Sequence, residues 1–356
     1  MVLAGPNSNQ THTCSPGRTV RSPECCKWFH ILDDIQANLL ENECGPESHE
    51  SLRIIFHDAI GFSKTGLFNG SFAGGGAVIT VVDGSIMINA DVELNYKENA
   101  GLDEMIYEQR DFAVKHSVSF GDFIHFAGAV GVSNCMGGPR LQFLAGRANI
   151  SRPAPDYMIP APFHSADQIF ARMEDAGFSP EEVAQLMAAH SVGAQHLIDP
   201  TVNNAPLDST PEDFDAQFFV ETLLEGTEPV GNGTALGERS SPIPGEFRLQ
   251  SDIVLARDIR SACEWQSFIT DQDAMIEKFQ RVMAKLSTLG QDTDKLTDCS
   301  EVIPVPSRVN RLATLPPGKS RGDVQAACSA TPFPAIPTTP GPVTSLPPVR
   351  HKYPHH

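Results

Sequence analysis

The segment Ser179-Pro-Glu-Glu-Val-Ala-Gln-Leu-Met-Ala-Ala-His-Ser-Val-Gly-Ala194 places a histidine on the apolar face of a predicted helix. Ser179 suits the N-cap, Pro180 suits the first helical position and Glu182 completes a capping box, so the spacing predicts a helix over 180–190. The residues that recur at helical spacing on one face are Val183, Leu186, Met187 and His190. A histidine in such a stripe is more often a packed core residue than a ligand, so His190 needs a second site to support it.

A second segment, Glu50-Ser-Leu-Arg-Ile-Ile-Phe-His-Asp58, carries another histidine in an apolar helical pattern. Arg53 and His57 are four residues apart, so they share one helical face beside Phe56. These residues alone leave two interpretations open. Either the guanidinium and the imidazole form a functional pair, or a buried arginine is held by nearby carboxylates and His57 is incidental.

Together the two segments resemble the distal and proximal haem segments of the secreted fungal haem peroxidases, class II of the plant peroxidase superfamily. The matching residues are Arg53-x-x-Phe-His-Asp58 and Ala189-His-Ser191. The resemblance covers residues 14 to about 340, and its further motifs are Ala127-Gly-Ala-Val-Gly-Val-Ser-Asn-Cys135, Asp208-Ser-Thr-Pro211, Leu255-Ala-Arg-Asp258, Cys263-Glu-Trp-Gln-Ser267 and Asp298-Cys-Ser300. The resemblance implies a mainly α, two-lobed fold with haem b between the lobes and very little β structure.

The pattern along the chain agrees with a mainly helical fold. Helical periodicity recurs at 25–42, 48–58, 102–117, 120–133, 165–175, 180–190, 211–224, 251–260 and 272–289, and only 77–88 has a β pattern. We expect an N-terminal extension over 1–13, a haem peroxidase domain over 14–303 and a Pro-rich tail over 304–356 that is partly stapled through Cys328. The domain would divide into a distal lobe, about 14–150, and a proximal lobe, about 151–303.

The composition limits the classes of partner that the chain can bind. The chain has 356 residues, of which 40% are hydrophobic, so it can bury a sizeable core. A formal charge of -18 argues against nucleic acid and anionic membranes as partners. No apolar run reaches the length of a membrane span. The opening Met-Val-Leu-Ala-Gly lacks the regions of a signal peptide, so we expect a mature sequence or an edited start, and a monomer as in the family.

The cysteines indicate an oxidising compartment. Eight cysteines, with no Cys-x-x-Cys spacing, favour disulfides over a zinc site. The resemblance implies four pairs: Cys14 with Cys26, Cys25 with Cys299, Cys44 with Cys135, and Cys263 with Cys328. Glycosylation sequons occur at Asn9, Asn69, Asn149 and Asn232. Both features predict a secreted, extracellular glycoprotein.

On the proximal side of the haem, the resemblance implies that His190 is the axial ligand of the iron. The other ring nitrogen of His190 would bond to Asp252, which fixes the tautomer and makes the ligand more electron-donating. Asp252 is also a candidate N-cap of the helix that follows it, and the two roles are compatible.

On the distal side, the resemblance implies that His57 is the general base for hydrogen peroxide and that Arg53 stabilises the charge that develops as the O–O bond breaks. Asn99 would orient His57, with Glu93 fixing Asn99, and Phe56 would flank the haem. The implied activity is hydrogen-peroxide-dependent oxidation of phenols, dyes and similar small reductants, in one-electron steps through a ferryl intermediate at the exposed haem edge.

Two Ca²⁺ sites are implied as well, although without the family the same residues would be solvated loop residues. The proximal ligands would be Ser191, Asp208, Thr210, Asp213 and Asp215. The distal ligands would be Asp58, Gly76, Asp83 and Ser85. The chain departs from the family pattern by the insert Val78-Ile-Thr-Val-Val82, which could displace the carbonyl of Gly76. The insert motivates one alternative, a haem- and calcium-binding protein with impaired turnover.

The positions that select the electron donor favour the generic, low-potential type of fungal peroxidase. Manganese-oxidising members have three carboxylates where this chain has Pro46, Glu50 and His196, so a single carboxylate remains. Lignin-oxidising members have an exposed tryptophan where this chain has Gln185, and an acidic residue at the haem edge where it has Ala161.

Other residues leave alternatives open. Trp28 and Trp265 lie in segments that resemble core positions, whereas Tyr107 or Tyr157 is a candidate surface radical site. Leu207 stands where ligninolytic members usually have Phe, which agrees with the generic type. The alternatives are a ligninolytic peroxidase with an atypical site and a residual manganese activity through Glu50.

Overall fold

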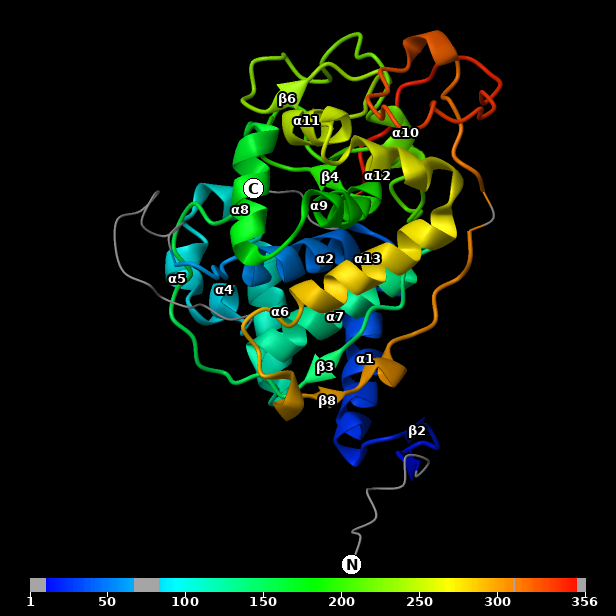
Figure 1. Cartoon of the computed structure of the whole chain (residues 1–356). Coiled ribbons are helices and arrows are strands. Elements are labelled where there is room, and N and C mark those ends of the chain that lie inside the picture. Colours follow the sequence, from blue (N-terminus) through cyan, green and yellow to red (C-terminus); the bar gives the residue numbers. More distant parts are fainter. Residues whose placement is uncertain (1–10, 67–82, 310, 351–356) are drawn as a thin grey trace, which may run out of the picture.

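The computed structural model describes residues 11–66, 83–309 and 311–350, and these residues form a mainly helical protein (Figure 1). Their buried apolar side chains form one continuous hydrophobic core. The α-helices are α1 (Cys26–Asn38), α2 (Pro46–Ala59), α4 (Ser85–Ile88), α5 (Ala90–Glu93), α6 (Asp103–His116), α7 (Phe120–Asn134), α8 (Ala166–Ala176), α9 (Pro180–Leu186), α10 (Gln217–Glu221), α11 (Gln250–Arg257), α12 (Ala262–Ser267) and α13 (Gln272–Leu286). The fold class predicted from the sequence is therefore confirmed.

Strands are short and marginal to the architecture. Within the described residues they form two-residue antiparallel pairs: β1 (His12–Thr13) with β2 (Thr19–Val20), β3 (Leu144–Ala145) with β8 (Thr297–Asp298), β4 (Ala194–Gln195) with β5 (Ala205–Pro206), and β6 (Glu238–Arg239) with β7 (Arg248–Leu249). β4–β5 matters for the site because it returns the chain after His190 to the segment that begins at Leu207.

Helix α2 is held against α7 at unusually close range. A Cβ atom at Gly128 would lie 2.4 Å from Cδ1 of Ile55, and one at Gly131 would lie 3.1 Å from Cα of Ser48. These glycines let the two backbones approach, and α7 is buried along most of its length. The close packing fixes the position of α2, which carries Arg53 and His57.

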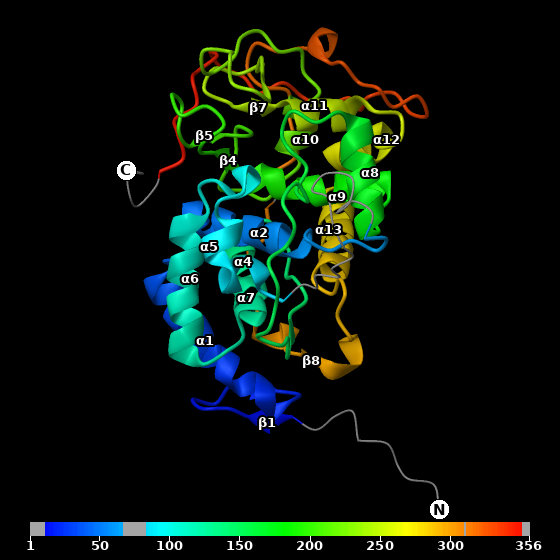
Figure 2. The ribbon, with the colours of Figure 1, turned by 90° about the vertical axis from the view of Figure 1, so that its left-hand side faces the viewer.

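Two aromatic clusters support the two ends of the molecule. Trp28 of α1, Phe126 of α7 and Phe143 have ring centroids 4.6–5.0 Å apart. At the other end, the rings of Trp265, Phe218, Phe219 and Phe268 form contacts of 4.9–5.5 Å among α10, α12 and the turn that follows α12. In Figures 1 and 2, α8, α9, α10, α11 and α12 lie on one side of α2, and α6, α7 and α1 lie on the other.

Arg172 joins α8 to the end of α2. Its guanidinium donates to the carbonyls of Ile60 and Phe62, just beyond α2, and to the carbonyl of Met158. Carbonyls at the C-terminal end of a helix lack partners within that helix, so an arginine from a neighbouring element is an effective cap. The cap fixes the end of α2 relative to α8.

All four disulfides follow the predicted pairing: Cys14–Cys26, Cys25–Cys299, Cys44–Cys135 and Cys263–Cys328. The tail beyond residue 303 runs from the β8 end of the molecule to the opposite end (Figure 1) and is more tightly packed than its composition indicates. Leu315 and Phe333 are buried, and Cys328 is bonded to α12.

Three sequence expectations are wrong in detail. The β pattern over 77–88 gives helix α4 at Ser85–Ile88, where the carboxylate of Asp58 accepts from the amides of Gly84 and Ile86, and 77–82 lies outside the described residues. The helix expected over 180–190 ends at Leu186 and continues as a 3₁₀-helix, η3 (Met187–Val192). The helix expected over 211–224 is reduced to α10 and is preceded by turns.

Local hydrogen bonds explain the shortening of that last helix. Oδ1 of Asp208 accepts from the amide of Thr210 at 2.8 Å, and Oδ1 of Asp215 accepts from the amide of Gln217 at 2.8 Å. Asp side chains that bond the backbone two residues ahead compete with helical hydrogen bonds. The segment therefore folds as turns until Gln217.

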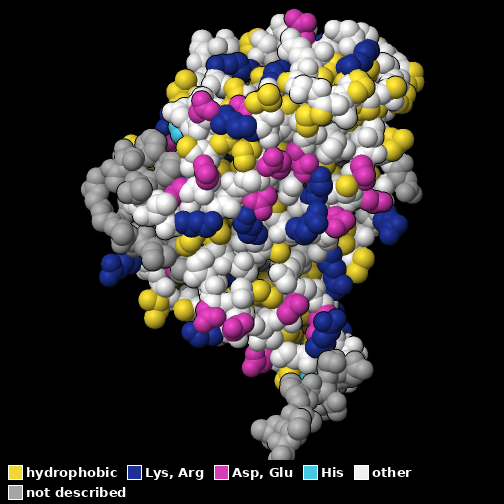
Figure 3. All heavy atoms as spheres, viewed as in Figure 1, with side chains coloured by type: hydrophobic (Ala, Val, Ile, Leu, Met, Phe, Trp, Pro, Cys, Tyr) yellow, Lys and Arg dark blue, Asp and Glu magenta, His cyan; other side chains and the backbone are white. Residues whose placement is uncertain are grey.

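Acidic and basic side chains both lie on the surface, although the chain has a net charge of -18. On the face shown in Figure 3, acidic and basic side chains are interspersed across the middle of the molecule. Among the described residues, no helix combines the length and apolar character that crossing a membrane requires.

Candidate active site

Arg53 and His57 meet on α2 as their spacing predicts. Nε of Arg53 donates to Nε2 of His57 at 3.1 Å, and Nδ1 of His57 lies 2.8 Å from Oδ1 of Asn99. Nδ2 of Asn99 donates to the backbone carbonyl of Glu93 at 2.9 Å, so Oδ1 of Asn99 is the atom that faces the imidazole. An amide oxygen only accepts, so Nδ1 of His57 carries the proton and Nε2 carries the lone pair.

The environment keeps His57 neutral. Burial and the neighbouring charge of Arg53 lower the pKa of His57 to about 3, although the bond to Asn99 acts in the opposite direction. The imidazole is therefore an available base over most of the acidic and neutral pH range. Phe56 flanks it edge-on, with ring centroids 6.1 Å apart.

Glu93 supports Asn99, but not through its carboxylate as an acidic residue would suggest. Its backbone carbonyl accepts from Asn99, and its Oε1 accepts from the amide of Ala154 at 3.0 Å. The carboxyl group instead ties α5 to the segment around Ala154. No sequence signal distinguishes a main-chain role from a side-chain role, so only the structure shows this arrangement.

His190 lies on η3, and its Nδ1 is 3.2 Å from Oδ2 of Asp252 on α11. Asp252 is buried and is the third residue of α11, whose N-cap is Leu249, so the N-cap role considered from the sequence is wrong. Phe218 packs edge-on against the imidazole, with centroids 5.7 Å apart. These two contacts fix the orientation of the ring.

The residues on the two sides fit a haem group. The bond to Asp252 leaves Nε2 of His190 as the atom that would hold a haem iron, and the His190 side chain is 32% exposed inside a well-packed region. Across from η3, α2 presents a neutral imidazole and a guanidinium, which are the groups that peroxide cleavage requires. α2 and η3 are in direct contact in the fold.

The residues expected at the proximal calcium site form an acidic cluster in which Ser191, Asp208 and Asp215 are buried. Oγ1 of Thr210 donates to Oδ1 of Asp215 at 3.1 Å, and burial together with the charge of Asp215 raises the pKa of Asp208. Oδ2 of Asp208 is buried without a hydrogen-bond partner among the described residues. Ser191 is fully buried after His190, at the start of the β4–β5 return to Asp208.

Arg311 from the tail also reaches this cluster, which the sequence did not predict. Its guanidinium pairs with the carboxylates of Asp213 and Asp215. The Asp213 side chain is thus turned to the arginine, which leaves its backbone carbonyl as the expected calcium ligand. Arg311 does not satisfy Oδ2 of Asp208, a buried carboxylate oxygen of the kind that Ca²⁺ prefers, so the donor set fits Ca²⁺.

The distal acidic cluster lies between α2 and α4. Burial raises the pKa of Asp58 to about 6 and that of Asp83 to about 7, and the charge of Asp58 contributes to the second shift. Oδ1 of Asp83 is buried without a hydrogen-bond partner in the described part of the chain, and Ser85 is buried beside it. Gly76 and the insert at 78–82 lie outside the described residues.

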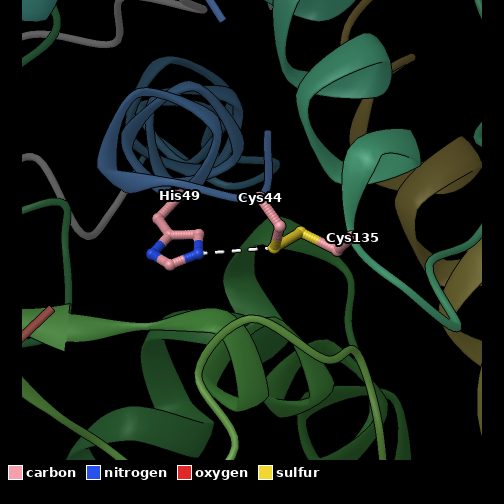
Figure 4. A group of neighbouring side chains, drawn as sticks. All are labelled: Cys44, His49 and Cys135. Carbon is pink, nitrogen blue, oxygen red and sulfur yellow. Dashed lines mark hydrogen bonds between the residues drawn. A yellow bond between two sulfur atoms is a disulfide. The ribbon is translucent and has the colours of Figure 1, made fainter. Parts of the chain in front are cut away.

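A different group of potential metal ligands is formed by Cys44, His49 and Cys135 (Figure 4). Both sulfur atoms belong to the Cys44–Cys135 disulfide, so neither is a thiolate. Nε2 of His49 lies 3.5 Å from Sγ of Cys44. Because metal binding by cysteine requires the thiolate, this group is a structural contact of α2 and not a metal site.

Comparison with known proteins identifies the family. The family model described as peroxidase matches residues 31–271, which includes both histidines and Asp252. The chain belongs to the peroxidase family. A second model, the fungal peroxidase extension region, matches residues 274–351. The members of this family are haem peroxidases, so the enzyme is an oxidoreductase that uses hydrogen peroxide, with haem as its implied cofactor.

Relatives of this peroxidase place it among the class II fungal enzymes. It is 50% identical to versatile peroxidase VPS1 of Pleurotus eryngii over 96% of this chain and 92% of that protein. It is also 50% identical to ligninase A of Phanerodontia chrysosporium, over 94% of this chain and 90% of the relative. Ligninase H2 of the same fungus is 49% identical over 97% and 93% of the two chains.

The positions that the sequence led us to expect at the donor site have side-chain partners within the chain. Nε2 of His196 lies 3.5 Å from Oε1 of Glu50, and both side chains are buried, so the remaining carboxylate faces an imidazole. Gln185 donates to Glu264 at 2.7 Å. Both tryptophans of the chain are fully buried, as predicted.

Proposed function

We propose that His57 is the general base of this peroxidase, with Arg53 as the residue that stabilises developing charge and Asn99 as the residue that orients the base. The observation that carries this proposal is the chain of bonds from Glu93 through Asn99 to Nδ1 of His57, which leaves the lone pair on Nε2. Nε2 takes a proton from one oxygen of hydrogen peroxide and returns it to the oxygen that departs as water. Arg53 stabilises that leaving oxygen while the bond breaks.

His190 would hold the iron through Nε2, with Asp252 fixing its tautomer, and Phe56 would flank the haem. Haem, when bound, supplies an iron that accepts hydrogen peroxide on its open side and keeps the two oxidising equivalents of the cleaved bond. Asp252 makes His190 more electron-donating, because a buried carboxylate that accepts from Nδ1 favours negative charge on the ring.

The electron donors are small phenols, dyes and similar low-potential reductants that reach the haem edge. Three observations support this donor class: both tryptophans are buried, Gln185 is engaged with Glu264, and Glu50 faces His196. A manganese titration of steady-state turnover tests the alternative, and we expect no saturable Mn²⁺ oxidation. Saturation with Mn²⁺ at micromolar concentration would contradict this assignment.

Two Ca²⁺ ions brace the two histidines. The proximal ligands would be Ser191, Asp208, Thr210, Asp213 and Asp215, and the described distal ligands would be Asp58, Asp83 and Ser85. Ser191 follows His190 and Asp58 follows His57, so each ion would act one residue from a functional imidazole. We further propose a secreted monomer, since the four disulfides fit an oxidising compartment and the sequon residues Asn149 and Asn232 are exposed.

The substitution His57→Leu tests the base. Removing the base should slow the reaction of the holoenzyme with peroxide by about 10²–10⁴-fold while haem stays bound. Stopped-flow absorption at the haem band gives the rate, and His30→Leu on the exposed face of α1 is the matched control. A His57→Leu enzyme that reacts at the parental rate would refute the assignment.

A further inference from the structure

The tail carries a positive charge into the acidic cluster of the proximal calcium site. Nη2 of Arg311 bridges two carboxylates, because it lies 2.8 Å from Oδ2 of Asp215 and also pairs with Oδ2 of Asp213. Asp215 is buried, whereas the Arg311 side chain is 51% exposed. The guanidinium therefore reaches the cluster from the solvent side.

Hydrogen bonds outside the cluster hold this part of the tail in place. On one side of Arg311, the carbonyl of Ser307 accepts from the amide of Gly137 at 2.7 Å. On the other side, the amide of Thr314 donates to Oε1 of Gln217 at 3.0 Å, and its carbonyl accepts from Nε2 of Gln217 at 2.9 Å. These contacts use no expected calcium ligand, so the tail presents Arg311 to the cluster whether or not calcium is bound.

Acidic groups exceed basic groups around Asp208. The charges that act on it as like charges are those of Asp215, Glu221 and Glu246. Arg248 is directed elsewhere, because its Nε lies 4.0 Å from Oε1 of Glu246 and its other nitrogens donate to backbone carbonyls. Within the described part of the chain, Arg311 is the cation that forms ion pairs with carboxylates of the cluster. The positive charge that the cluster requires is therefore divided between Arg311 and a bound ion.

Both carboxylate oxygens of Asp215 have donors within the protein. Oδ1 accepts from the amide of Gln217 at 2.8 Å and from Oγ1 of Thr210 at 3.1 Å, and Oδ2 accepts from Arg311. A calcium ion that binds through Oδ2 would displace the guanidinium. One that binds through Oδ1 would face the guanidinium across the carboxylate, where like charges repel each other. Arg311 therefore opposes calcium in either case.

We propose that Arg311 is a built-in competitor of the proximal calcium ion, which lowers the affinity of the site for Ca²⁺ and stabilises the cluster when calcium is removed. The proposal rests on the proximal calcium site proposed above and adds the residue that sets its affinity. The guanidinium compensates part of the buried negative charge, so calcium adds less stability than it would to an uncompensated cluster. The effect is reciprocal, because calcium binding weakens the pairing of Arg311 by the same free energy.

Equilibrium dialysis of the haem-loaded enzyme against buffered Ca²⁺, followed by elemental analysis, gives the calcium affinity. The proximal ion is the one that Asp208→Ala loses. At low ionic strength, Arg311→Gln should lower the Kd of that ion about three- to tenfold, whereas Arg311→Lys keeps the charge and should stay close to the parent. The difference should shrink at about 1 M NaCl, because salt screens a half-exposed pair.

The matched control is Arg308→Gln, which removes an exposed arginine from the same part of the tail and should bind calcium like the parent. Equal or weaker calcium binding in Arg311→Gln than in this control would overturn the proposal. Weaker binding would show that the guanidinium positions the ligands instead of competing with the ion.

The unfolding temperature gives a second readout. After calcium is chelated, Arg311→Gln should unfold at a lower temperature than Arg308→Gln, because its buried carboxylates are then uncompensated. With saturating calcium the difference between the two variants should be smaller. The same difference with and without calcium would contradict the competition, since the stability conferred by Arg311 would then be independent of the ion.

Two further results separate this proposal from the proposed function. The reaction of the calcium-saturated parent with peroxide, followed by stopped flow, reports on the peroxidase roles alone, and its absence would refute them without changing the calcium result. If the parent reacts with peroxide but has the same calcium Kd as Arg311→Gln, only the competition is refuted. An Asp208→Ala enzyme that retains all the calcium of the parent would refute the proximal site, and with it the role of Arg311.

Discussion

Replacing Asn99 with Asp changes one charge at the hydrogen bond that orients His57. Oδ1 of Asn99 is 2.8 Å from Nδ1 of His57, so a carboxylate of nearly the same shape would accept the same proton. The substitution keeps the shape of the side chain, removes the bond from Nδ2 to the Glu93 carbonyl and favours the protonated imidazole. The pKa of His57 should therefore rise, and the base should be lost at higher pH than in the parent enzyme.

The magnitude follows from the structure. The pKa of His57 is lowered to about 3, first by burial and then by Arg53. Two unit charges about 4 Å apart attract by about 4 kcal/mol at an effective dielectric constant of 20. Since one pKa unit corresponds to about 1.4 kcal/mol, the pKa in Asn99→Asp should rise by about three units, to about 6. At pH 5 roughly a tenth of the variant would carry a neutral His57, against nearly all of the parent.

The assay is the second-order rate of reaction with hydrogen peroxide between pH 3 and 8, followed by stopped flow. Asn99→Asp should react about tenfold more slowly than the parent at pH 5 and recover at pH 8. Asn95→Asp is the control, because Asn95 is exposed and its Nδ2 donates to the carbonyl of Asp91 instead. An acid limb at the same pH in Asn99→Asp and the parent would refute the assignment of His57 as the titrating base.

Three further predictions concern the proximal side, calcium and pH. Asp252→Asn should raise the reduction potential of the haem iron in a spectroelectrochemical titration, because His190 becomes less electron-donating; an unchanged potential would contradict this. A calcium chelator should lower the unfolding temperature of the parent, because calcium at 100 times its Kd stabilises the folded protein by about 2.7 kcal/mol. The chelator should lower the unfolding temperature of Asp208→Ala by less, because that variant has lost one calcium ligand. Buried neutral histidines have depressed pKa values, so the unfolded chain binds more protons below pH 6.5. The contribution of His49, His57 and His125 to the free energy of unfolding should therefore fall between pH 7 and 5, by up to about 1.4 kcal/mol per pH unit for each histidine. The buried carboxyl groups of Asp58 and Asp83 contribute in the opposite direction, because their raised pKa values make the folded chain bind more protons in this range. Denaturant titrations of the parent and of His125→Gln at pH 7 and 5 isolate the contribution of one histidine, and an identical pH dependence in the two proteins would exclude it.

Local patterns predicted most of the helices because their signals are carried by neighbouring residues. The capping box of Ser179 and Glu182 forms as its spacing indicates, and the Arg53–His57 pair meets on one face of α2. The same reasoning failed where a distant group determines the local structure. The carboxylate of Asp58 binds the amides that begin α4, and no pattern within 83–88 contains that information.

In the candidate site, too, some features could be predicted from local sequence and others depend on distant residues. Its imidazoles, guanidinium and carboxylates could be named from motifs, and the four disulfides followed from the resemblance. The main-chain role of Glu93, the pairing of Arg311 with Asp213 and the cap of Arg172 on the end of α2 could not be predicted. These three contacts join residues that are between six and more than a hundred positions apart in the sequence. Each contact depends on the direction in which one polar atom points.

The sequence alone therefore determined the family, the mainly helical fold and the identity of the reactive groups, since these depend on residue type, order and short-range spacing. The tertiary structure decided which ring nitrogen of His57 carries the lone pair and that the Asp213 carboxylate faces Arg311 of the tail. Burial and hydrogen-bond direction set those properties, and both arise only when distant segments pack together.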